Sequence, residues 1–131
     1  MTILGVGNSF TGGSQSLEIV KDHGYGYTGT VSVINAETTM LEFTSGNYYF
    51  VGSLQVFSSE SGNDDLRLIT YLNNSPIMVQ TFSNTFSTSV EGYNETEIII
   101  PSYTEFKSTL EVTGGTSPTE CFIMLTGRIY R

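Results

Sequence analysis

Residues 47–57 read N-Y-Y-F-V-G-S-L-Q-V-F and decide the fold class. Their apolar and polar side chains alternate, which predicts a β-strand with one face in a hydrophobic core. The polar face carries Ser53 and Gln55. The apolar face carries Tyr48, Phe50, Leu54 and Val56.

The same alternation recurs along the chain, between turns rich in Gly, Asn, Ser and Pro. With 131 residues, the chain suits one domain. Many short strands at this spacing predict an all-β sandwich or barrel of eight to nine strands. We expect Phe50, Leu54, Leu68, Leu110 and Ile123 in its core. The expected strands are 17–20, 26–34, 40–44, 48–58, 66–72, 77–83, 95–100, 106–112 and 121–130.

Residues 1–16 differ from the rest, because Gly and Ser break up the segment and its apolar residues are scattered. We therefore divide the chain into an N-terminal arm, 1–16, and a domain, 17–131. The arm's apolar residues are expected to anchor it in shallow apolar pockets on a neighbouring subunit or another partner. These anchoring candidates are Ile3, Leu4, Val6 and Phe10.

The charge balance argues against two classes of partner. The net charge is −8 with only five basic residues, too few to form a basic patch. We therefore expect no binding to nucleic acid and none to an anionic membrane. The lone cysteine, Cys121, sits in an apolar strand and is interpreted as a buried thiol. An unbridged cysteine fits assembly in a reducing cytoplasm.

No motif supports catalysis, a metal or a cofactor. The one histidine, His23, lies between turn residues and is expected in a solvated loop. The pair Asp64–Asp65 lacks the alternating spacing of a calcium loop and fits a charged hairpin end. A second acidic group has the paired carboxylates that a glycosidase needs. Glu95 and Glu97, however, are better explained as outward-facing residues of a strand. This group is Glu91, Glu95 and Glu97.

Several strands are apolar on both faces, although a two-layer sandwich buries only one face of each sheet. A spare face rich in Tyr, Phe and Met has the composition of a subunit interface, while scattered surface hydrophobes are the plainer alternative. The interface candidates are Tyr71, Phe122, Met124 and Tyr130.

Two segments carry a family resemblance. Residues 43–54, F-T-S-G-N-Y-Y-F-V-G-S-L, resemble the "aromatic, turn glycine, Tyr-x-Phe" strand of complement-type and tumour necrosis factor-type jelly rolls. Residues 98–106, I-I-I-P-S-Y-T-E-F, and the closing T-G-R-I-Y-R of 126–131 look like small jelly-roll virion proteins of tailed bacteriophages. The second proline of that family's corner is replaced here by Ser102.

The resemblance implies a jelly-roll β-sandwich that forms a homotrimer. It implies a decoration or cement protein that binds the major capsid protein on the exterior of the virion, or a small tail domain. The alternative is a receptor- or glycan-binding module of a tail or fibre, whose loops would stack on and hydrogen-bond to sugar. The glycan-contact candidates are Asn73, Asn74, Tyr93 and Asn94.

Overall fold

Ten strands and no helix make up the part of the chain that the structure describes. The structure is a computed structural model, and it describes residues 17–58, 65–83, 93–114 and 119–131. The all-β class predicted from the sequence is confirmed. The strands are β1 (Glu18–Val20), β2 (His23–Tyr27), β3 (Val31–Val33), β4 (Thr38–Thr44), β5 (Tyr49–Ser58), β6 (Asp65–Leu72), β7 (Ser75–Ser83), β8 (Tyr93–Ile100), β9 (Glu105–Gly114) and β10 (Thr119–Tyr130).

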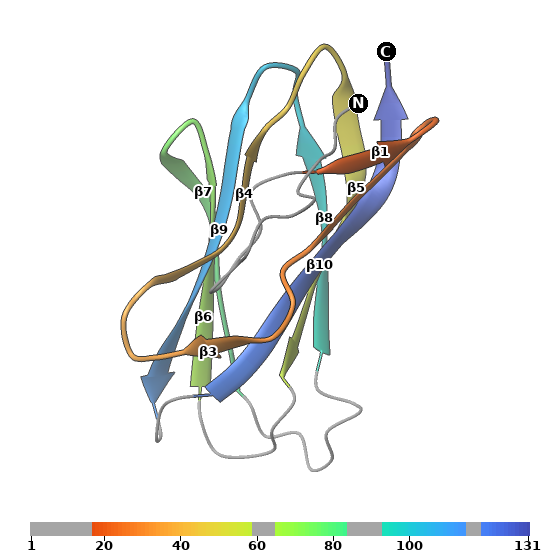
Figure 1. The fold of residues 1–131 in the computed structure, drawn as a ribbon. Coiled ribbons are helices and arrows are strands. Elements are labelled where there is room, and N and C mark those ends of the chain that lie inside the picture. The colour runs from red at the N-terminus through yellow and green to blue at the C-terminus, as the bar shows by residue number, and fades with distance from the viewer. Residues whose placement is uncertain (1–16, 59–64, 84–92, 115–118) are drawn as a thin grey trace.

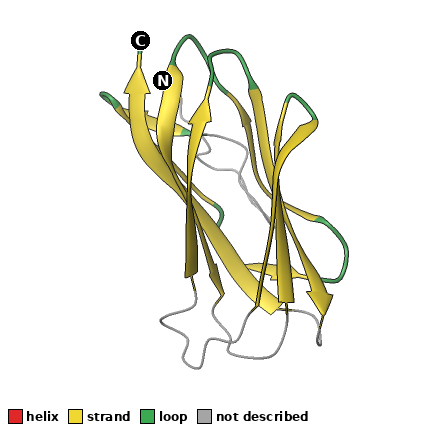
Figure 2. Cartoon of the chain, turned by 180° about the vertical axis from the view of Figure 1, so that it is seen from behind, coloured by secondary structure: helices red, strands yellow, loops and turns green. Residues whose placement is uncertain are grey.

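The strands form two antiparallel sheets. One sheet has six strands in the order β1-β2-β10-β5-β8, with β3 also paired to β10. The other has four strands in the order β4-β9-β6-β7. Figures 1 and 2 show the two sheets as the separate layers of a sandwich, consistent with a jelly roll. One edge of each layer, β8 in the first sheet and β7 in the second, lies on the same side of the molecule. A hydrogen bond from Thr96 Oγ1 to Gln80 Oε1 joins these two edges.

The hydrophobic core lies between the two sheets, because alternate residues of every long strand point inward. All five predicted core residues are at most 2% exposed, so this prediction is confirmed. The expected burial of Cys121 is confirmed as well. The described core residues that are largest and fully buried are Phe50, Phe106, Met40, Leu41, Leu54, Leu66, Leu68, Ile100, Leu110, Ile123, Leu125 and Val33.

Three glycines on neighbouring strands lie in one row, and the row includes Gly127 of the closing strand, β10. Gly127 pairs with Gly24 on one side and with Gly52 on the other. A Cβ on Gly52 would lie 2.8 Å from the Phe50 ring, and a Cβ on Gly24 would lie 2.9 Å from the same ring. The Phe50 ring thus occupies the space that side chains at these positions would need. At Gly127, the glycine of the "T-G-R" motif, a Cβ would lie 2.3 Å from Val51 O, so the close approach of the β5 backbone explains this position.

The segment expected as one strand, 26–34, forms two strands instead. Gly29 adopts a left-handed backbone with φ +73°, which interrupts the strand between β2 and β3. On either side of this break the chain pairs with β10, and Thr28 N donates a hydrogen bond to Ile123 O at 3.1 Å. The described part of the chain therefore has ten strands, one more than the nine ranges expected from the sequence.

The loop expected around His23 was also wrong, because His23 and Gly24 begin β2. Val20 pairs with His23, which leaves only Lys21 and Asp22 for the turn. Lys21 takes the left-handed conformation, φ +57°, that such a short turn requires. The residues Asp22, His23 and Gly24 are typical of loops, so the sequence indicated a longer loop. The sequence alone does not show that the turn contains only two residues.

The two segments that carry the family resemblance contact each other. The loop after β4 contains Ser45 and Gly46, and the corner between β8 and β9 contains Tyr103 and Thr104. Ser45 N donates to Thr104 O at 2.9 Å, and Tyr103 N donates to Gly46 O at 3.0 Å. The two motifs therefore form one connected structure at this end of the sandwich.

Candidate binding surfaces

The outer face of the six-stranded sheet carries aromatic and aliphatic side chains on four neighbouring strands. Strand alternation turns these residues away from the core, because their neighbours in sequence point inward. We call this set the aromatic face. It consists of Tyr25, Tyr27, Tyr49, Val51, Phe57, Ile99, Phe122, Met124 and Tyr130.

Three rings meet in the centre of one half of the aromatic face. Phe57 and Phe122 are cross-strand partners and stack with centroids 4.6 Å apart and an interplanar angle of 11°. Tyr27 meets Phe122 edge to face at 5.7 Å and 76°. Offset and edge-to-face geometries are the favourable ones for aromatic pairs, so these rings hold one another in place.

The other half of the aromatic face is more exposed. Tyr49 pairs with Tyr130, and Val51 pairs with Ile99. These four side chains are between 39% and 58% exposed. With Arg131, three of them line a shallow pocket of about 330 Å³. Contiguous exposed apolar patches are a feature that often marks interaction sites in proteins.

A larger groove continues from this half of the face to the edge of the sandwich, where β8 and β7 lie. Its volume is about 720 Å³, and we call it the edge groove. Glu97 and Arg128 add charge to a lining that is otherwise mostly apolar. The groove is lined by Val51, Gly52, Ser53, Ile77, Met78, Glu97, Ile98, Ile99, Arg128 and Tyr130.

The structure separates the four interface candidates. Phe122, Met124 and Tyr130 share the aromatic face, as strand alternation predicted. Tyr71 lies in β6, on the outer face of the other sheet, so it belongs to a different surface. Its phenol is engaged there, since Tyr71 Oη donates a hydrogen bond to Glu37 Oε1 at 2.7 Å. The candidates therefore lie on two different surfaces, and their place in a trimer interface stays a prediction.

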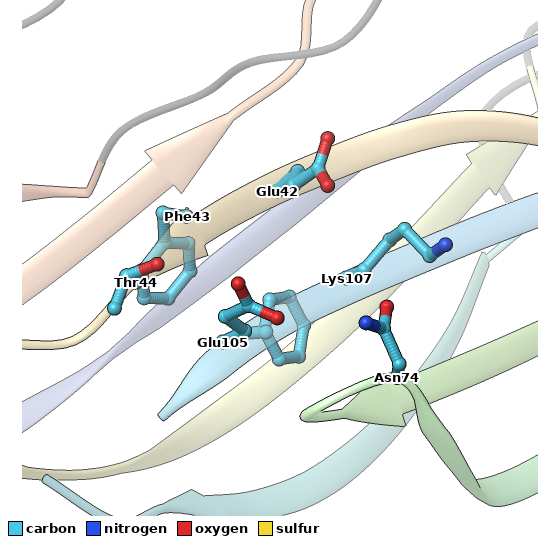
Figure 3. A pocket seen from close by; sticks show the side chains of 7 residues that line it. Glu42, Phe43, Thr44, Asn74, Glu105 and Lys107 are labelled. Carbon is cyan, nitrogen blue, oxygen red and sulfur yellow. The ribbon is translucent and has the colours of Figure 1, made fainter. Parts of the chain in front are cut away.

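A polar pocket of about 320 Å³ lies on the outer face of the four-stranded sheet. Its walls come from β4, β9 and the turn between β6 and β7. Figure 3 shows the carboxylates of Glu42 and Glu105, the amide of Asn74 and the amino group of Lys107 around it. Besides these four, Phe43, Thr44 and Phe106 line the pocket.

Hydrogen bonds fix the turn that forms one wall of this pocket. Asn73 and Asn74 have φ values of +52° and +66°, and two left-handed residues in succession indicate a type I′ hairpin turn. Asn73 N donates to Glu105 O at 2.8 Å, and Glu105 N donates to Asn73 Oδ1 at 3.0 Å. The turn is thereby tied to β9, which positions Asn74 at the pocket.

A polar cluster around Glu37 lies on the same sheet face. Glu37 Oε1 accepts hydrogen bonds from Tyr71 Oη and from Thr109 Oγ1, the second at 3.0 Å. These bonds lower the pKa of the Glu37 carboxyl, with the bond from Tyr71 the largest cause. The same bond raises the pKa of Tyr71. Lys107 Nζ lies 4.5 Å from the centroid of the Tyr71 ring, a cation–π geometry.

The four glycan-contact candidates do not form one site. Asn73 and Asn74 lie in the turn between β6 and β7, whereas Tyr93 and Asn94 begin β8. Figure 1 places that turn and the start of β8 at opposite ends of the sandwich. Only Asn74 lines a described pocket. The four residues therefore belong to two separate parts of the surface, and glycan contact at either part stays a prediction. Sequence alone could not assign these loops to an end of the sandwich.

The remaining chemical candidates are dispersed. His23 is exposed, and its Nδ1 lies 3.2 Å from Asp22 Oδ1. Glu95 and Glu97 are exposed on β8, as their outward positions predicted. Within residues 17–58, 65–83, 93–114 and 119–131, no group of three or more His, Cys, Asp or Glu could hold a metal ion. The arm candidates Ile3, Leu4, Val6 and Phe10, together with Asp64 and Glu91, lie outside the described residues.

Sequence reasoning missed much of the aromatic face. Tyr25 and Tyr27 were overlooked, although they alternate with Gly24 and Gly26. That alternation is the available signal, because glycine can face the core where a large side chain from a neighbouring strand fills the space. Glu42, Glu105 and Lys107 were missed because the polar pocket combines two strands and a turn that are distant in sequence.

No family model and no curated protein matches the chain. Among solved structures, a family 35 carbohydrate-binding module from an environmental isolate is similar, with 16% identity and a TM-score of 0.48. The match covers 100% of this chain and 93% of that one. The insecticidal δ-endotoxin Cry8Ea1 from Bacillus thuringiensis is similar at 13% identity and a TM-score of 0.41, over 79% of this chain and 18% of the toxin. In the described part of the chain, no helix could span a membrane.

Proposed function

We propose that this chain is a non-catalytic structural protein that associates with copies of itself through the aromatic face. The observation that supports this most is the set of Tyr, Phe and Met side chains on adjacent strands of one sheet, several of them substantially exposed. Aromatic residues, Met and Arg are enriched in subunit interfaces. A flat sheet face of this kind suits packing against another folded subunit.

The finer proposal is a homotrimer that decorates or cements the exterior of a tailed-bacteriophage capsid. Its support is the resemblance of residues 98–106 and 126–131 to jelly-roll virion proteins of tailed bacteriophages. The homotrimer rests on the resemblance of residues 43–54 to complement-type and tumour necrosis factor-type jelly rolls. In this proposal, the protein binds the major capsid protein after assembly in the host cytoplasm. Binding that occurs only on the assembled shell stabilises the shell by mass action.

The test of self-association is the mass in solution. Light scattering at micromolar concentration should give about three times the chain mass of 14.3 kDa. Tyr130→Glu should shift the population toward monomer, because it places a charge in the interface. The matched control is Ile34→Glu, since Ile34 is 47% exposed and lies outside the aromatic face. A wild-type monomer, or equal effects of both substitutions, would contradict the proposal.

The test of the capsid role uses purified phage capsids that lack the protein. The wild-type chain should co-sediment with these particles at saturable stoichiometry. No binding to empty capsids would overturn the capsid role and leave self-association as a separate result.

A second candidate is glycan recognition at the polar pocket. One observation favours it: Asn74, from a rigid turn, faces two carboxylates across a pocket that offers both donors and acceptors (Figure 3). Sugar hydroxyls need such mixed partners. Isothermal titration with saccharides and adhesion to host cells test this candidate. Asn74→Ala should abolish either signal while Asn35→Ala, an exposed asparagine elsewhere, should preserve it.

A further inference from the structure

The edge groove lies where two sheet edges run close together without an outer neighbour. In the described residues, β8 ends the six-stranded sheet and β7 ends the four-stranded sheet. Thr96 Oγ1 donates to Gln80 Oε1 at 3.0 Å and bridges these edges. The groove lies beyond this bridge, toward the turn between β6 and β7, and includes Ile77 and Ile99.

The groove has the properties of an acceptor for an extended segment. Ile77 is 50% exposed and Ile99 is 58% exposed, so apolar side chains that line the edge groove are accessible to solvent. An edge strand such as β8 also presents backbone N–H and C=O groups that can pair with an added strand. Extended peptides bind such edges by backbone hydrogen bonds, with alternate side chains entering apolar pockets.

The occupant with matching chemistry is the segment 1–16 of another copy of the chain. It contains no charged side chain and places Ile3, Leu4, Val6 and Phe10 among small and polar residues. The body of the protein carries all of the −8 net charge, so a neutral segment approaches exposed Glu97 without like-charge repulsion.

Length and starting point also fit this occupant. The arm precedes β1, which lies at the opposite edge of the six-stranded sheet from β8. Four strand spacings separate those edges, about 19 Å. Sixteen extended residues reach about 50 Å. The arm is therefore more than twice as long as its own sheet is wide and can extend beyond its own subunit.

We propose that residues 1–16 of one copy lie in the edge groove of a neighbouring copy and extend its six-stranded sheet at β8. This inference rests on the proposed self-association and names the segment that links the subunits. The contact joins two different surfaces, so it is heterologous and forms a closed ring when the rotation between subunits is one-third of a turn. A ring of three copies then holds three equivalent arm contacts.

Cross-linking between single-cysteine chains of full length tests the proposal. Chains with Val6→Cys and chains with Ile99→Cys are refolded together and oxidised. In a one-to-one mixture, up to about half of the chains should form a disulfide-linked dimer of the two types, because each arm meets a groove of the other type in half of the contacts. The control pair combines Val6→Cys with Ile34→Cys and should give less than a tenth of that yield. The native Cys121 is buried, and the unsubstituted chain reports its background.

Three outcomes have distinct meanings. A heterodimer at Ile99 but not at Ile34 supports the proposal. An intrachain disulfide in the double variant Val6→Cys/Ile99→Cys, without interchain products, overturns it by placing the arm on its own subunit. Absence of cross-links overturns it as well. If light scattering then still gives a trimer, the aromatic face assembles without the arm; a monomer overturns the proposed self-association too.

Discussion

The hydroxyl of Ser45 donates a hydrogen bond to the carbonyl oxygen of Pro101 at 2.7 Å. The same hydroxyl oxygen accepts a hydrogen bond from Thr104 N at 2.9 Å. Ser45 is 2% exposed, so water cannot replace these bonds. One side chain thereby joins the loop after β4 to the corner between β8 and β9, more than fifty residues away in sequence.

Ser45→Ala should lower the free energy of unfolding by about 1–3 kcal/mol, because it leaves the buried Thr104 N–H and the part-buried Pro101 carbonyl oxygen without their partner. Urea denaturation measures the change. Ser32→Ala, at an exposed position of β3, should change stability by less than about 0.5 kcal/mol. Equal effects at the two serines would show that the Ser45 bonds do not stabilise the corner.

Gly127→Ala should lower the free energy of unfolding by about 3 kcal/mol through overpacking. The new Cβ would lie 2.3 Å from Val51 O and 2.5 Å from Gly52 Cα, and backbone atoms cannot move aside cheaply. At the control position Gly114, the atoms nearest to a Cβ would belong to the flexible side chain of Asp65, the first at 3.2 Å. Thermal unfolding of Gly127→Ala and Gly114→Ala compares the two, and a well-tolerated Gly127→Ala would refute the close approach.

Leu54→Ala and Leu110→Ala should each lower the free energy of unfolding by about 2–5 kcal/mol, because both side chains are fully buried and leave cavities. Val79→Ala, at a position 58% exposed, is the control and should have little effect. Losses below about half a kcal/mol at both leucines would mean that the core is elsewhere.

Thr70→Val and Thr109→Val should have opposite effects on stability. Thr70 Oγ1 is buried and has no hydrogen-bond partner in the described part of the chain, so valine should stabilise by about 1 kcal/mol. Thr109 Oγ1 donates to Glu37, so valine there should destabilise by a similar amount. Changes of the same sign in urea denaturation would contradict this assignment.

Glu37 should make stability depend on acidic pH. Because its folded-state pKa is lowered, the carboxylate stabilises the fold above the ordinary glutamate pKa of about 4.3. That contribution is lost as the pH falls through the lowered pKa. The stability difference between wild type and Glu37→Gln should therefore shrink at low pH in urea denaturation. Tyr71→Phe, which removes the main hydrogen-bond donor, should reduce the same pH dependence.

Local alternation predicted the all-β class and most strands, because a period of two needs only neighbours in sequence. It also placed Phe122, Met124 and Tyr130 on one outer face correctly. It failed where backbone conformation decides, at Gly29 and Lys21, whose left-handed φ values split one strand and shortened one turn. Those choices depend on pairing with β10 and β1, which lie elsewhere in the chain.

The sequence by itself determined most of the strands, the core side chains and the excess of exposed aromatic residues. Only the tertiary structure decided which exposed residues share a surface. It placed Tyr71 on the opposite sheet from Tyr130, and it separated Asn74 from Tyr93 at opposite ends of the sandwich. The physical reason is that side-chain direction follows from local backbone geometry, whereas strand order and loop placement follow from packing between segments distant in sequence.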